Sequence, residues 1–465
     1  MKTLKKITAV ILALSMVVTV ISINPAETNA KVTIKSKKTV TLAVGKKSTI
    51  KVKQKGAKFK SSNKKIATVT KKGKITAKNP GTCKITVTVK KSKKKVTVKV
   101  VPAAVKMESV KNLTDKGVQV KWNSVKGATG YNVYYSTNAK SGFKSVKVGK
   151  TTSTFINNLN VGSTYYFKVK ARSKVRGKTY TSAKYSNVVS EKVRKLVWND
   201  EFNGTKLDTT KWNNDGATGD GGYGNNELQN YQMDYCEVKD GSLIIKPQFE
   251  TKRNSTTPVK KTYYSTKLWT RNQYSLTYGK VEFRAKLPKG KGTWAACWML
   301  GNQSNYGSWP KCGEIDILET TSELAKTIIP QSIHCTRFNG MPTSSGNKYK
   351  HTTVSTATSE YHTYGIVWNA KEITFTIDGK ETWTYDPNTY SATGTGTSNK
   401  DIWPFDKPCY LIINCAIGGT LGGPVGTDYW TKVGTKEYKD SKGNITGIND
   451  VYQDKMYVDW VRVYQ

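Results

Sequence analysis

GEIDILE, residues 313–319, sets three carboxylates among three aliphatic side chains in seven consecutive positions. In a regular β-strand the side chains alternate between two faces, so Glu314 and Asp316 share one face while the isoleucines pack behind them. Strict alternation would turn Glu319 to the opposite face. A one-residue β-bulge near Leu318 would return it to the face of the other acids, and bulges often re-aim side chains beside active sites. The stretch therefore predicts a bulged strand with one acidic face.

Three acids on a buried strand are costly unless the protein uses them. Two glutamates that lean together over a concave sheet can reach the separation of about 5–5.5 Å that a retaining glycoside hydrolase needs. Neighbouring carboxyl groups titrate as a coupled set, and one raised pKa supplies a general acid. The alternative, an acidic strand without a catalytic role, leaves the spacing unexplained.

Residues 197–465 form the part of the chain around this stretch, with balanced charge and abundant Trp and Gly. They suffice for one large two-sheet sandwich. Several long motifs in this part resemble glycoside hydrolase family 16, in particular its laminarinase-like branch. These motifs are WNDEFNG (198–204), GNNELQNYQ (224–232), YGKVEFRAKLPKGKGTWAACWML (278–300), WPKCGEIDILE (309–319), YHTYGIVWNAKEITFTIDG (361–379), WPFDKPCYLIINCAIGG (403–419) and YVDWVRVY (457–464).

The resemblance implies an all-β fold, a curved two-sheet jelly-roll sandwich with its active site in a concave cleft. It implies Glu314 as nucleophile, Asp316 as assisting acid and Glu319 as acid/base. The expected reaction is endo-acting, retaining hydrolysis of β-1,3-glucan by double displacement. Two rivals stay open. One is the same chemistry on mixed-linkage β-1,3-1,4-glucan or a β-galactan, and the other is a non-catalytic carbohydrate-binding or adhesion protein.

Sugar recognition needs flat apolar platforms and a few fixed polar groups. Trp294, Trp298 and Trp309 flank the acidic stretch and are candidates for stacking on glucose rings, with core packing as the alternative for each. The family's pattern further implies three polar contacts to substrate. They are Asn226 and Arg284 upstream of the cut, and His334 beside the acid/base.

No cofactor is expected for catalysis, because the chain has only three His, no His cluster for zinc and no phosphate-cradling Gly loop. Serine hydrolysis is not expected either, because the G-x-S-x-G elbow is missing. The resemblance does imply a structural calcium site on the convex face. Its expected ligands are Glu201, the backbone carbonyl of Gly241, and Asp459. Oxygen ligands suit calcium, although the acids could instead form ordinary hydrogen bonds.

Two smaller segments precede this domain. Residues 31–101 alternate polar with β-branched side chains and resemble a bacterial Ig-like (type 2) domain, with Ile85 and Val87 expected in the core. Residues 102–196 resemble a fibronectin type III module, with Trp122 at its centre and Tyr165 on its tyrosine-corner strand. The expected architecture is two small Ig-like β-sandwich modules in front of a jelly-roll catalytic domain.

Charge is distributed unevenly along the chain, whose formal net charge is +44. Residues 31–101 hold 24 Lys, no Arg and no acid, and residues 102–196 hold 19 basic and 3 acidic residues. Such a field attracts polyanions. Because lysines alternate along strands without any arginine, nucleic acid is not the expected partner, and an anionic cell-wall polymer is. A surface that serves only solubility is the alternative.

Residues 1–30 read as a signal peptide, with lysines near the start, an apolar run over 7–23, and small residues Thr28 and Ala30 before the expected cleavage point. An uncleaved anchor is the alternative, because this run is slightly long. The expectation is therefore a secreted protein, extracellular or wall-associated, with no membrane segment after cleavage. The seven cysteines do not form a disulfide framework and are expected mostly as small buried hydrophobes, although pairing of some stays open.

Overall fold

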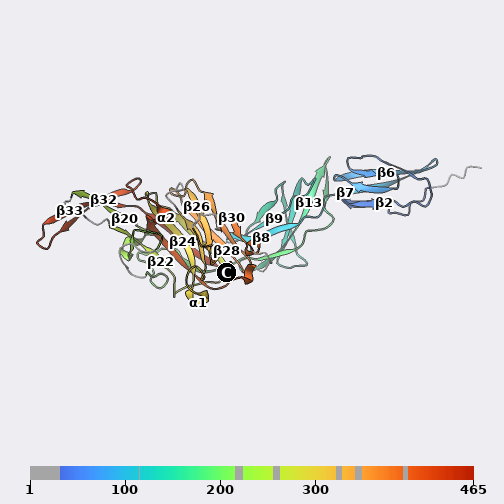
Figure 1. Cartoon of the computed structure of the whole chain (residues 1–465). Coiled ribbons are helices and arrows are strands. Elements are labelled where there is room, and N and C mark those ends of the chain that lie inside the picture. The colour runs from blue at the N-terminus through green and yellow to red at the C-terminus, as the bar shows by residue number, and fades with distance from the viewer. Residues whose placement is uncertain are drawn as a thin grey trace, which may run out of the picture. The chain divides into compact units, whose positions relative to one another are not determined.

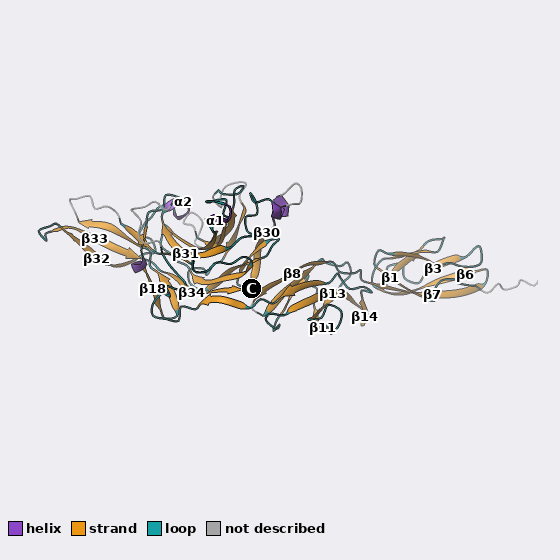
Figure 2. Ribbon diagram, turned by 90° about the horizontal axis from the view of Figure 1, so that it is seen from below, coloured by secondary structure: helices purple, strands orange, loops and turns teal. Residues whose placement is uncertain are grey.

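In the computed structural model, the described residues are 32–114, 116–214, 224–254, 262–320, 327–340, 348–390 and 396–465. Their regular secondary structure is almost wholly β-strand (Figure 2). The helical elements among them are two single-turn α-helices, α1 (Gln303–Tyr306) and α2 (Gly419–Gly422), and three 3-10 turns. None of these is long and apolar enough to cross a membrane. The predicted all-β class is confirmed, whereas the predicted signal peptide lies outside the described residues.

The first module is a two-sheet sandwich. One sheet has the order β1-β7-β6-β3 and the other the order β2-β5-β4. Its core contains Ile85, Val87 and Val96, all fully buried, as the alternation in the sequence predicts. The strands are β1 (Thr39–Ala43), β2 (Lys47–Thr49), β3 (Lys58–Ser61), β4 (Ala67–Val69), β5 (Lys74–Ala77), β6 (Gly81–Val89) and β7 (Ser92–Val101).

The second module also has two sheets, with orders β11-β10-β13-β14 and β12-β9-β8, and β15 pairs with β13. The predicted tyrosine corner is present: the backbone N–H of Asn160 donates to the Tyr165 hydroxyl at 3.1 Å. Trp122 is 1% exposed, as its predicted central position requires. The strands are β8 (Met107–Thr114), β9 (Gly117–Trp122), β10 (Gly130–Ser136), β11 (Lys144–Val148), β12 (Ser153–Ile156), β13 (Thr164–Val175), β14 (Lys178–Thr181) and β15 (Val189–Lys192).

By compactness the chain divides into two units. Of the described residues, those within 32–105, 124–132 and 170–185 form the first unit, and those within 106–123, 133–169 and 186–465 form the second. This division does not follow the module boundaries that the sequence suggests, so the boundaries at 101 and 196 stay predictions.

The C-terminal part is dominated by a sheet of eight strands and a sheet of six (Figure 1). The larger has the order β18-β19-β34-β23-β28-β29-β30, with β16 paired to β34, and the smaller has the order β22-β31-β24-β25-β26-β27. Strands of the larger sheet are β16 (Leu196–Asp200), β18 (Cys236–Lys239), β19 (Ser242–Ile245), β23 (Gly279–Lys286), β28 (His362–Trp368), β29 (Ile373–Ile377), β30 (Lys380–Tyr385) and β34 (Met456–Tyr464). Strands of the smaller sheet are β22 (Lys267–Trp269), β24 (Thr293–Gly301), β25 (Glu314–Glu319), β26 (Ile328–His334), β27 (Lys348–Thr353) and β31 (Cys409–Ile417).

A further five-stranded sheet has the order β17-β21-β20-β33-β32. Its outer strand β32 is exposed along almost its whole length. Lysines and two register shifts along this edge discourage pairing with another chain. The strands are β17 (Asn230–Tyr231), β20 (Gln248–Asn254), β21 (Tyr263–Ser265), β32 (Thr431–Lys439) and β33 (Ile445–Gln453).

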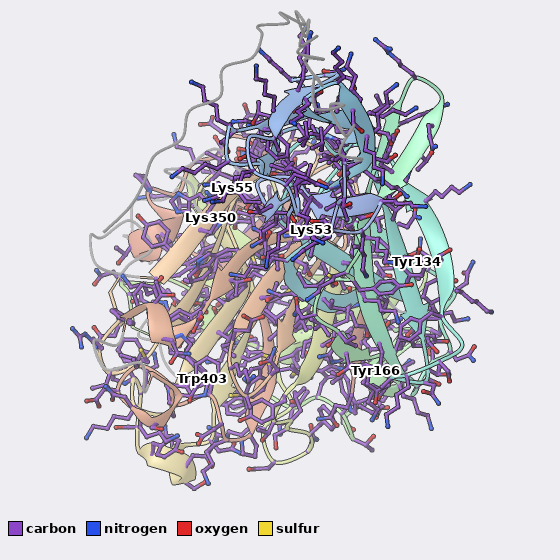
Figure 3. All side chains as sticks on the ribbon, turned by 90° about the vertical axis from the view of Figure 1, so that its right-hand side faces the viewer. Lys53, Lys55, Tyr134, Tyr166, Lys350 and Trp403 are labelled. Carbon is purple, nitrogen blue, oxygen red and sulfur yellow. The ribbon has the colours of Figure 1, made fainter. Side chains whose placement is uncertain are left out.

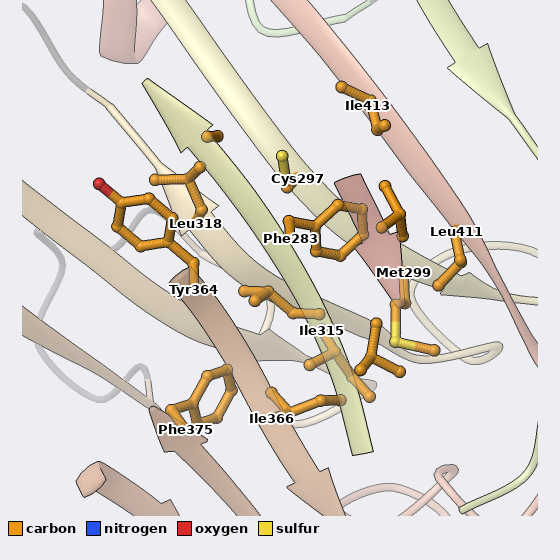
Figure 4. Packing of buried hydrophobic residues seen from close by; sticks show 14 of the residues in the cluster. Phe283, Cys297, Met299, Ile315, Leu318, Tyr364, Ile366, Phe375, Leu411 and Ile413 are labelled. Carbon is orange, nitrogen blue, oxygen red and sulfur yellow. The ribbon is translucent and has the colours of Figure 1, made fainter. Parts of the chain in front are cut away.

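The core of the C-terminal part lies between its two large sheets. Figure 4 shows Ile315 and Leu318 from the smaller sheet among Phe283, Tyr364 and Ile366 from the larger one. All five side chains are fully buried. Burial of this apolar area stabilises the sandwich by about 25 cal/mol per Å², and it fixes which face of each strand is left for function.

All seven cysteines are free, and six of them are buried. Burial raises the pKa of the Cys236, Cys312 and Cys335 thiols to about 11. They are therefore thiols at neutral pH and pack as small apolar side chains, as predicted.

Candidate active site

Strand β25 contains the predicted bulge. Its pairing with β24 sets Leu318 opposite Cys297 and Asp316 opposite Trp298, so Ile317 is the extra residue. Ile317 and Leu318 are both fully buried in the core. Consequently the next side chain, Glu319, returns to the face that carries Glu314 and Asp316, and all three acids line one cleft.

The cleft lies on the outer face of the six-stranded sheet and has a volume of about 370 Å³, within the range of ligand sites. Strand β24 alternates across this sheet. Ala295, Cys297 and Met299 enter the core, whereas the residues between them line the cleft. The lining residues are Gly224, Asn225, Glu227, Tyr231, Lys267, Trp294, Ala296, Trp298, Leu300, Trp309, Glu314, Asp316, Glu319 and Asn414.

All three predicted tryptophans reach the cleft, in different environments. Trp294 is 8% exposed, and its Nε1–H donates to Glu319 Oε1 at 3.1 Å. Trp298 donates its Nε1–H to Asn414 Oδ1 at 2.7 Å. Trp309 is 48% exposed. Exposed indole surface is what stacking on a sugar requires, so Trp309 is the best placed of the three for that role.

The central acid is held from strand β26. The Ser332 hydroxyl lies 2.7 Å from Asp316 Oδ2 and 3.4 Å from Glu319 Oε2, so it can donate to either carboxylate. His334 Nε2 lies 3.0 Å from Asp316 Oδ2 and 4.0 Å from Glu314 Oε1. The pairing of Glu314 with His334 across β25 and β26 produces this arrangement.

Burial and mutual repulsion shift the proton affinities of the acids. Burial raises the pKa of Glu319 to about 8, with the charge of Asp316 as the next cause. Burial, followed by the charge of Asp316, also holds the pKa of Glu314 well above its ordinary value. Burial alone would lower the pKa of His334, but the hydrogen bond and charge of Asp316 outweigh it and raise that pKa to about 10. His334 is therefore an imidazolium at neutral pH, and its charge lowers the pKa of both glutamates.

His334 and Asn226 are not placed as predicted. His334 was expected beside Glu319, but it contacts Asp316 and approaches Glu314, because its register places it opposite the start of β25. Asn226 is exposed and does not line the cleft, whereas its chain neighbour Asn225 does. Both asparagines lie in a turn with positive φ, 53° at Asn225 and 59° at Asn226, so the alternation of a strand does not decide where their side chains point.

The prediction that Arg284 binds substrate is wrong. Arg284 lies on β23 of the eight-stranded sheet, between β28 and β34. Its neighbours Phe283 and Ala285 enter the core, so Arg284 faces away from the other sheet and its cleft. There it pairs with Asp459 and stacks over the Tyr361 ring.

A chain of hydrogen bonds along the cleft was not predicted. Asn414 Nδ2 donates to the Tyr231 hydroxyl at 2.9 Å, and this hydroxyl lies 3.3 Å from Glu227 Oε2. Gln229 Nε2 donates to the same Glu227 oxygen at 2.7 Å. Asn414 interrupts the apolar run of β31, and a lone amide in such a strand was the available signal.

The expected calcium ligands do not fit a cation as they are placed. Both carboxylate oxygens of Glu201 accept hydrogen bonds from Arg462 at 2.8 Å. Asp459 is paired with Arg284. Gly241 lies in the turn between β18 and β19 with a φ of 73°. A calcium ion would have to displace two guanidinium groups, so this arrangement does not favour the predicted site.

Hydrolysis of a glycosidic bond needs two carboxyl groups with different proton affinities on either side of a bound sugar. The bulged strand brings Glu314 and Glu319 together in a cleft walled by indoles, and a curved jelly roll supports them. Fold and site together define a glycoside hydrolase.

The comparisons with known proteins name the family. The model of glycosyl hydrolases family 16 matches residues 231–435, that of the group 2 bacterial Ig-like domain matches 17–100, and that of the fibronectin type III domain matches 103–186. The chain belongs to glycosyl hydrolases family 16.

Its relatives include "Glucan endo-1,3-beta-glucosidase A1" of Niallia circulans, 38% identical over 58% of this chain but over only 38% of that protein. "Beta-glucanase" of Rhodothermus marinus is 34% identical over 58% of this chain and 85% of that protein. Mixed-linkage glucanases are also among the relatives. Among solved structures, the laminarinase from Flavobacterium sp. UMI-01 is 34% identical, with 58% of this chain and 100% of that chain covered and a TM-score of 0.45.

Proposed function

We propose that this protein is an endo-acting, retaining β-glucanase that hydrolyses β-1,3-glucan of the laminarin type. The observation that carries the proposal is the bulge at Ile317, because it turns Glu319 into the cleft that holds Glu314. The names of two relatives, both glucan endo-1,3-beta-glucosidases, support the β-1,3 linkage. Mixed-linkage β-1,3-1,4-glucan is the second candidate substrate, because mixed-linkage enzymes occur among the relatives.

In the proposed first step, Glu319 protonates the oxygen of the leaving sugar while Glu314 attacks the anomeric carbon. A pKa of about 8 keeps Glu319 protonated at neutral pH, as a general acid must be. The hydrogen bond from Trp294 aims its carboxyl group. The bond to the leaving oxygen breaks as the glycosyl–Glu314 ester forms, and the leaving sugar takes the Glu319 proton.

Glu314 must be ionised to attack, although burial and Asp316 raise its pKa. The His334 imidazolium opposes this effect from 4.0 Å and pairs with Asp316 at 3.0 Å. His334 therefore favours the carboxylate form of the nucleophile. In the second step, ionised Glu319 takes a proton from water, the hydroxide oxygen attacks the anomeric carbon, and Glu314 departs with the configuration retained.

The test of the proposal is Glu314→Gln, which removes the nucleophile and keeps the shape of the side chain. Hydrolysis of laminarin should fall by at least about 10⁴-fold while the unfolding temperature stays near that of the wild type. Glu437→Gln, an exposed acid on β32, is the matched control and should keep full activity. Wild-type turnover by the Glu314 variant would contradict the assignment.

Linkage and mode of action are separate questions. Reducing-sugar release from laminarin, lichenan and agarose, measured side by side, ranks the candidate substrates. We expect laminarin to be fastest, with a mixture of short oligosaccharides as early products. Glucose as the only early product would contradict endo action, and a preference for agarose would overturn the glucan assignment.

Export and retention are also part of the proposal. The leader-like residues 1–30 support secretion, and N-terminal sequencing of protein from culture medium should begin at Lys31. The cationic residues 31–196 support retention on anionic cell-wall polymers. Structural calcium is not part of the proposal, because both of its expected acidic ligands are already paired with arginines. Unchanged thermal stability after chelation would agree with that pairing.

A further inference from the structure

The first module carries a regular array of charge on one face. In its four-stranded sheet, alternate residues of each strand enter the core and the others point outward. Apart from Ala43 and Val101, which pair at one end of the sheet, the outward residues of the four strands are Lys or Thr. We call this surface the lysine–threonine face: Lys58, Lys60, Lys84, Lys93, Lys95, Lys99, Thr39, Thr41, Thr82, Thr86, Thr88 and Thr97.

The strand register orders these residues. Lys60 of β3 and Lys95 of β7 both stand opposite Thr86 of the strand between them. Lys58 and Lys93 flank Thr88 in the same way. The other two lysines also have threonine as their cross-strand neighbour, Lys84 opposite Thr97, and Lys99 opposite Thr82 and Thr41.

No two lysines of the face are therefore opposite each other on adjacent strands. Lysines two strands apart are separated by about 10 Å at the backbone, and those two residues apart on one strand by about 7 Å. This spacing limits the repulsion between like charges, which is strongest for directly opposed pairs. The hydroxyls between the ammonium groups add donors and acceptors for an oxygen-rich ligand.

A surface that serves only solubility does not require this composition. Such surfaces mix positively and negatively charged residues, and acidic residues improve solubility more than lysines do. Here residues 31–101 contain no acid at all, and every described lysine in them is exposed. Lys53 and Lys55, labelled in Figure 3, belong to this set but lie in a turn outside the face. The positive field has no internal counter-charge within the module.

We propose that the lysine–threonine face binds a linear polyanion of phosphodiester-linked polyol units. Ammonium groups bind phosphate as point charges and tolerate a flexible chain. Carboxylates and guanine are recognised best by the planar fork of arginine, which residues 31–101 lack. Their single aromatic residue, Phe59, packs against the core, so nothing on the face can stack on nucleic-acid bases.

The face has a defined end. The Thr82 hydroxyl lies 3.0 Å from the Tyr180 hydroxyl, within the same compact unit. The two edge strands of this sheet are β1 and β3, and β3 carries Lys58 and Lys60. The polymer is thus expected to cross the strands rather than to follow one of them.

The experiment compares two full-length variants with the same loss of charge. One carries Lys60→Gln, Lys84→Gln, Lys95→Gln and Lys99→Gln on the face. The matched control carries Lys53→Gln, Lys55→Gln, Lys71→Gln and Lys72→Gln in exposed turns. Binding of both to poly(glycerol phosphate) at low salt is measured by calorimetry, with polygalacturonate and oligo-dT as comparison polymers.

The face variant should bind poly(glycerol phosphate) at least about tenfold more weakly than the wild type, and the control variant less than about threefold more weakly. Equal losses in the two variants would show that net charge alone acts, and would overturn the proposal. So would wild-type protein that binds polygalacturonate or oligo-dT as tightly, or that binds none of the polymers. Laminarin hydrolysis should be unchanged in both variants, and its absence in the wild type would bear on the proposed enzyme function alone.

Discussion

Glu319 and Trp294 show how one hydrogen bond can set the working pH of the enzyme. The indole N–H donates to the Glu319 carboxyl group and lowers its pKa, against the larger effect of burial. Trp294→Phe removes this donor and should move the Glu319 pKa upward. The alkaline limb of the pH–rate profile, expected near pH 8 in the wild type, should then move to higher pH while kcat falls.

Trp298→Phe is the matched control for this prediction, because the Trp298 indole donates to Asn414 and not to a catalytic acid. Its alkaline limb should stay in place even if KM rises. If the limb moves equally in both variants, or in neither, the assignment of Glu319 as the general acid fails.

The proton on Glu319 also links stability to pH. Its pKa in the folded protein is about 8, above the ordinary value of 4.5. Proton binding to Glu319 therefore contributes to the free energy of unfolding. This contribution is fully present below about pH 4.5 and is lost as the pH rises through about 8. Glu319→Gln keeps the neutral shape at every pH. Its unfolding temperature should exceed that of the wild type at pH 9, and the difference should shrink towards pH 5 in calorimetric scans. A difference that does not vary with pH would contradict the raised pKa.

At the scale of the element, the number of residues between Asp316 and Glu319 in strand β25 decides which face of the sheet carries the Glu319 side chain. Catalysis depends on this number, because Glu319 must face the cleft. Deletion of Ile317 removes the extra residue, and regular alternation still leaves Glu319 on the cleft face. Insertion of one alanine after Leu318 instead turns Glu319 towards the core. Laminarin hydrolysis should survive the deletion at a reduced level, whereas the insertion should abolish it and lower the unfolding temperature, because it buries a carboxylate.

The two variants control each other, because both change the strand by one residue. Deletion also removes a buried isoleucine, so some loss of stability is expected from it as well. An insertion variant with more activity than the deletion variant would contradict the role of the bulge.

Strand parity also explains what the sequence could and could not predict. The acidic stretch specifies its own bulge, because regular alternation would bury Glu319. Arg284 could not be placed in this way, since alternation says which side of a strand a residue occupies but not which of two sheets the strand joins. His334 was assigned to the cleft, but the acid that it contacts depends on the register between β25 and β26, which is a tertiary property.

At the scale of the whole molecule, charge and catalysis are carried by different segments. Residues 31–101 contribute 24 lysines without an acid, whereas basic and acidic residues nearly balance in 197–465. A neutral glucan gains nothing from a cationic field, so the near-neutral catalytic domain suits its proposed substrate. The cationic segment can attract a polyanion without drawing it into the cleft, provided that the cleft offers no comparable array of cations. Among its lining residues Lys267 is the one cation, and acids outnumber it.

The same separation predicts a stability response to salt that differs between segments. Uncompensated lysines repel one another, and this repulsion is screened as the Debye length falls from about 30 Å at 0.01 M to about 3 Å at 1 M salt. The unfolding temperature of the first module should therefore rise by several degrees over this range, while that of the catalytic domain changes less. Residues 31–101 contain no tryptophan, so calorimetry detects their unfolding and tryptophan fluorescence does not. A calorimetric transition that moves with salt and is silent in fluorescence would belong to the lysine-rich module. If salt raised the unfolding temperature of every transition equally, repulsion between the lysines would not destabilise the first module in particular. The regular spacing of the lysine–threonine face would then already suppress that repulsion.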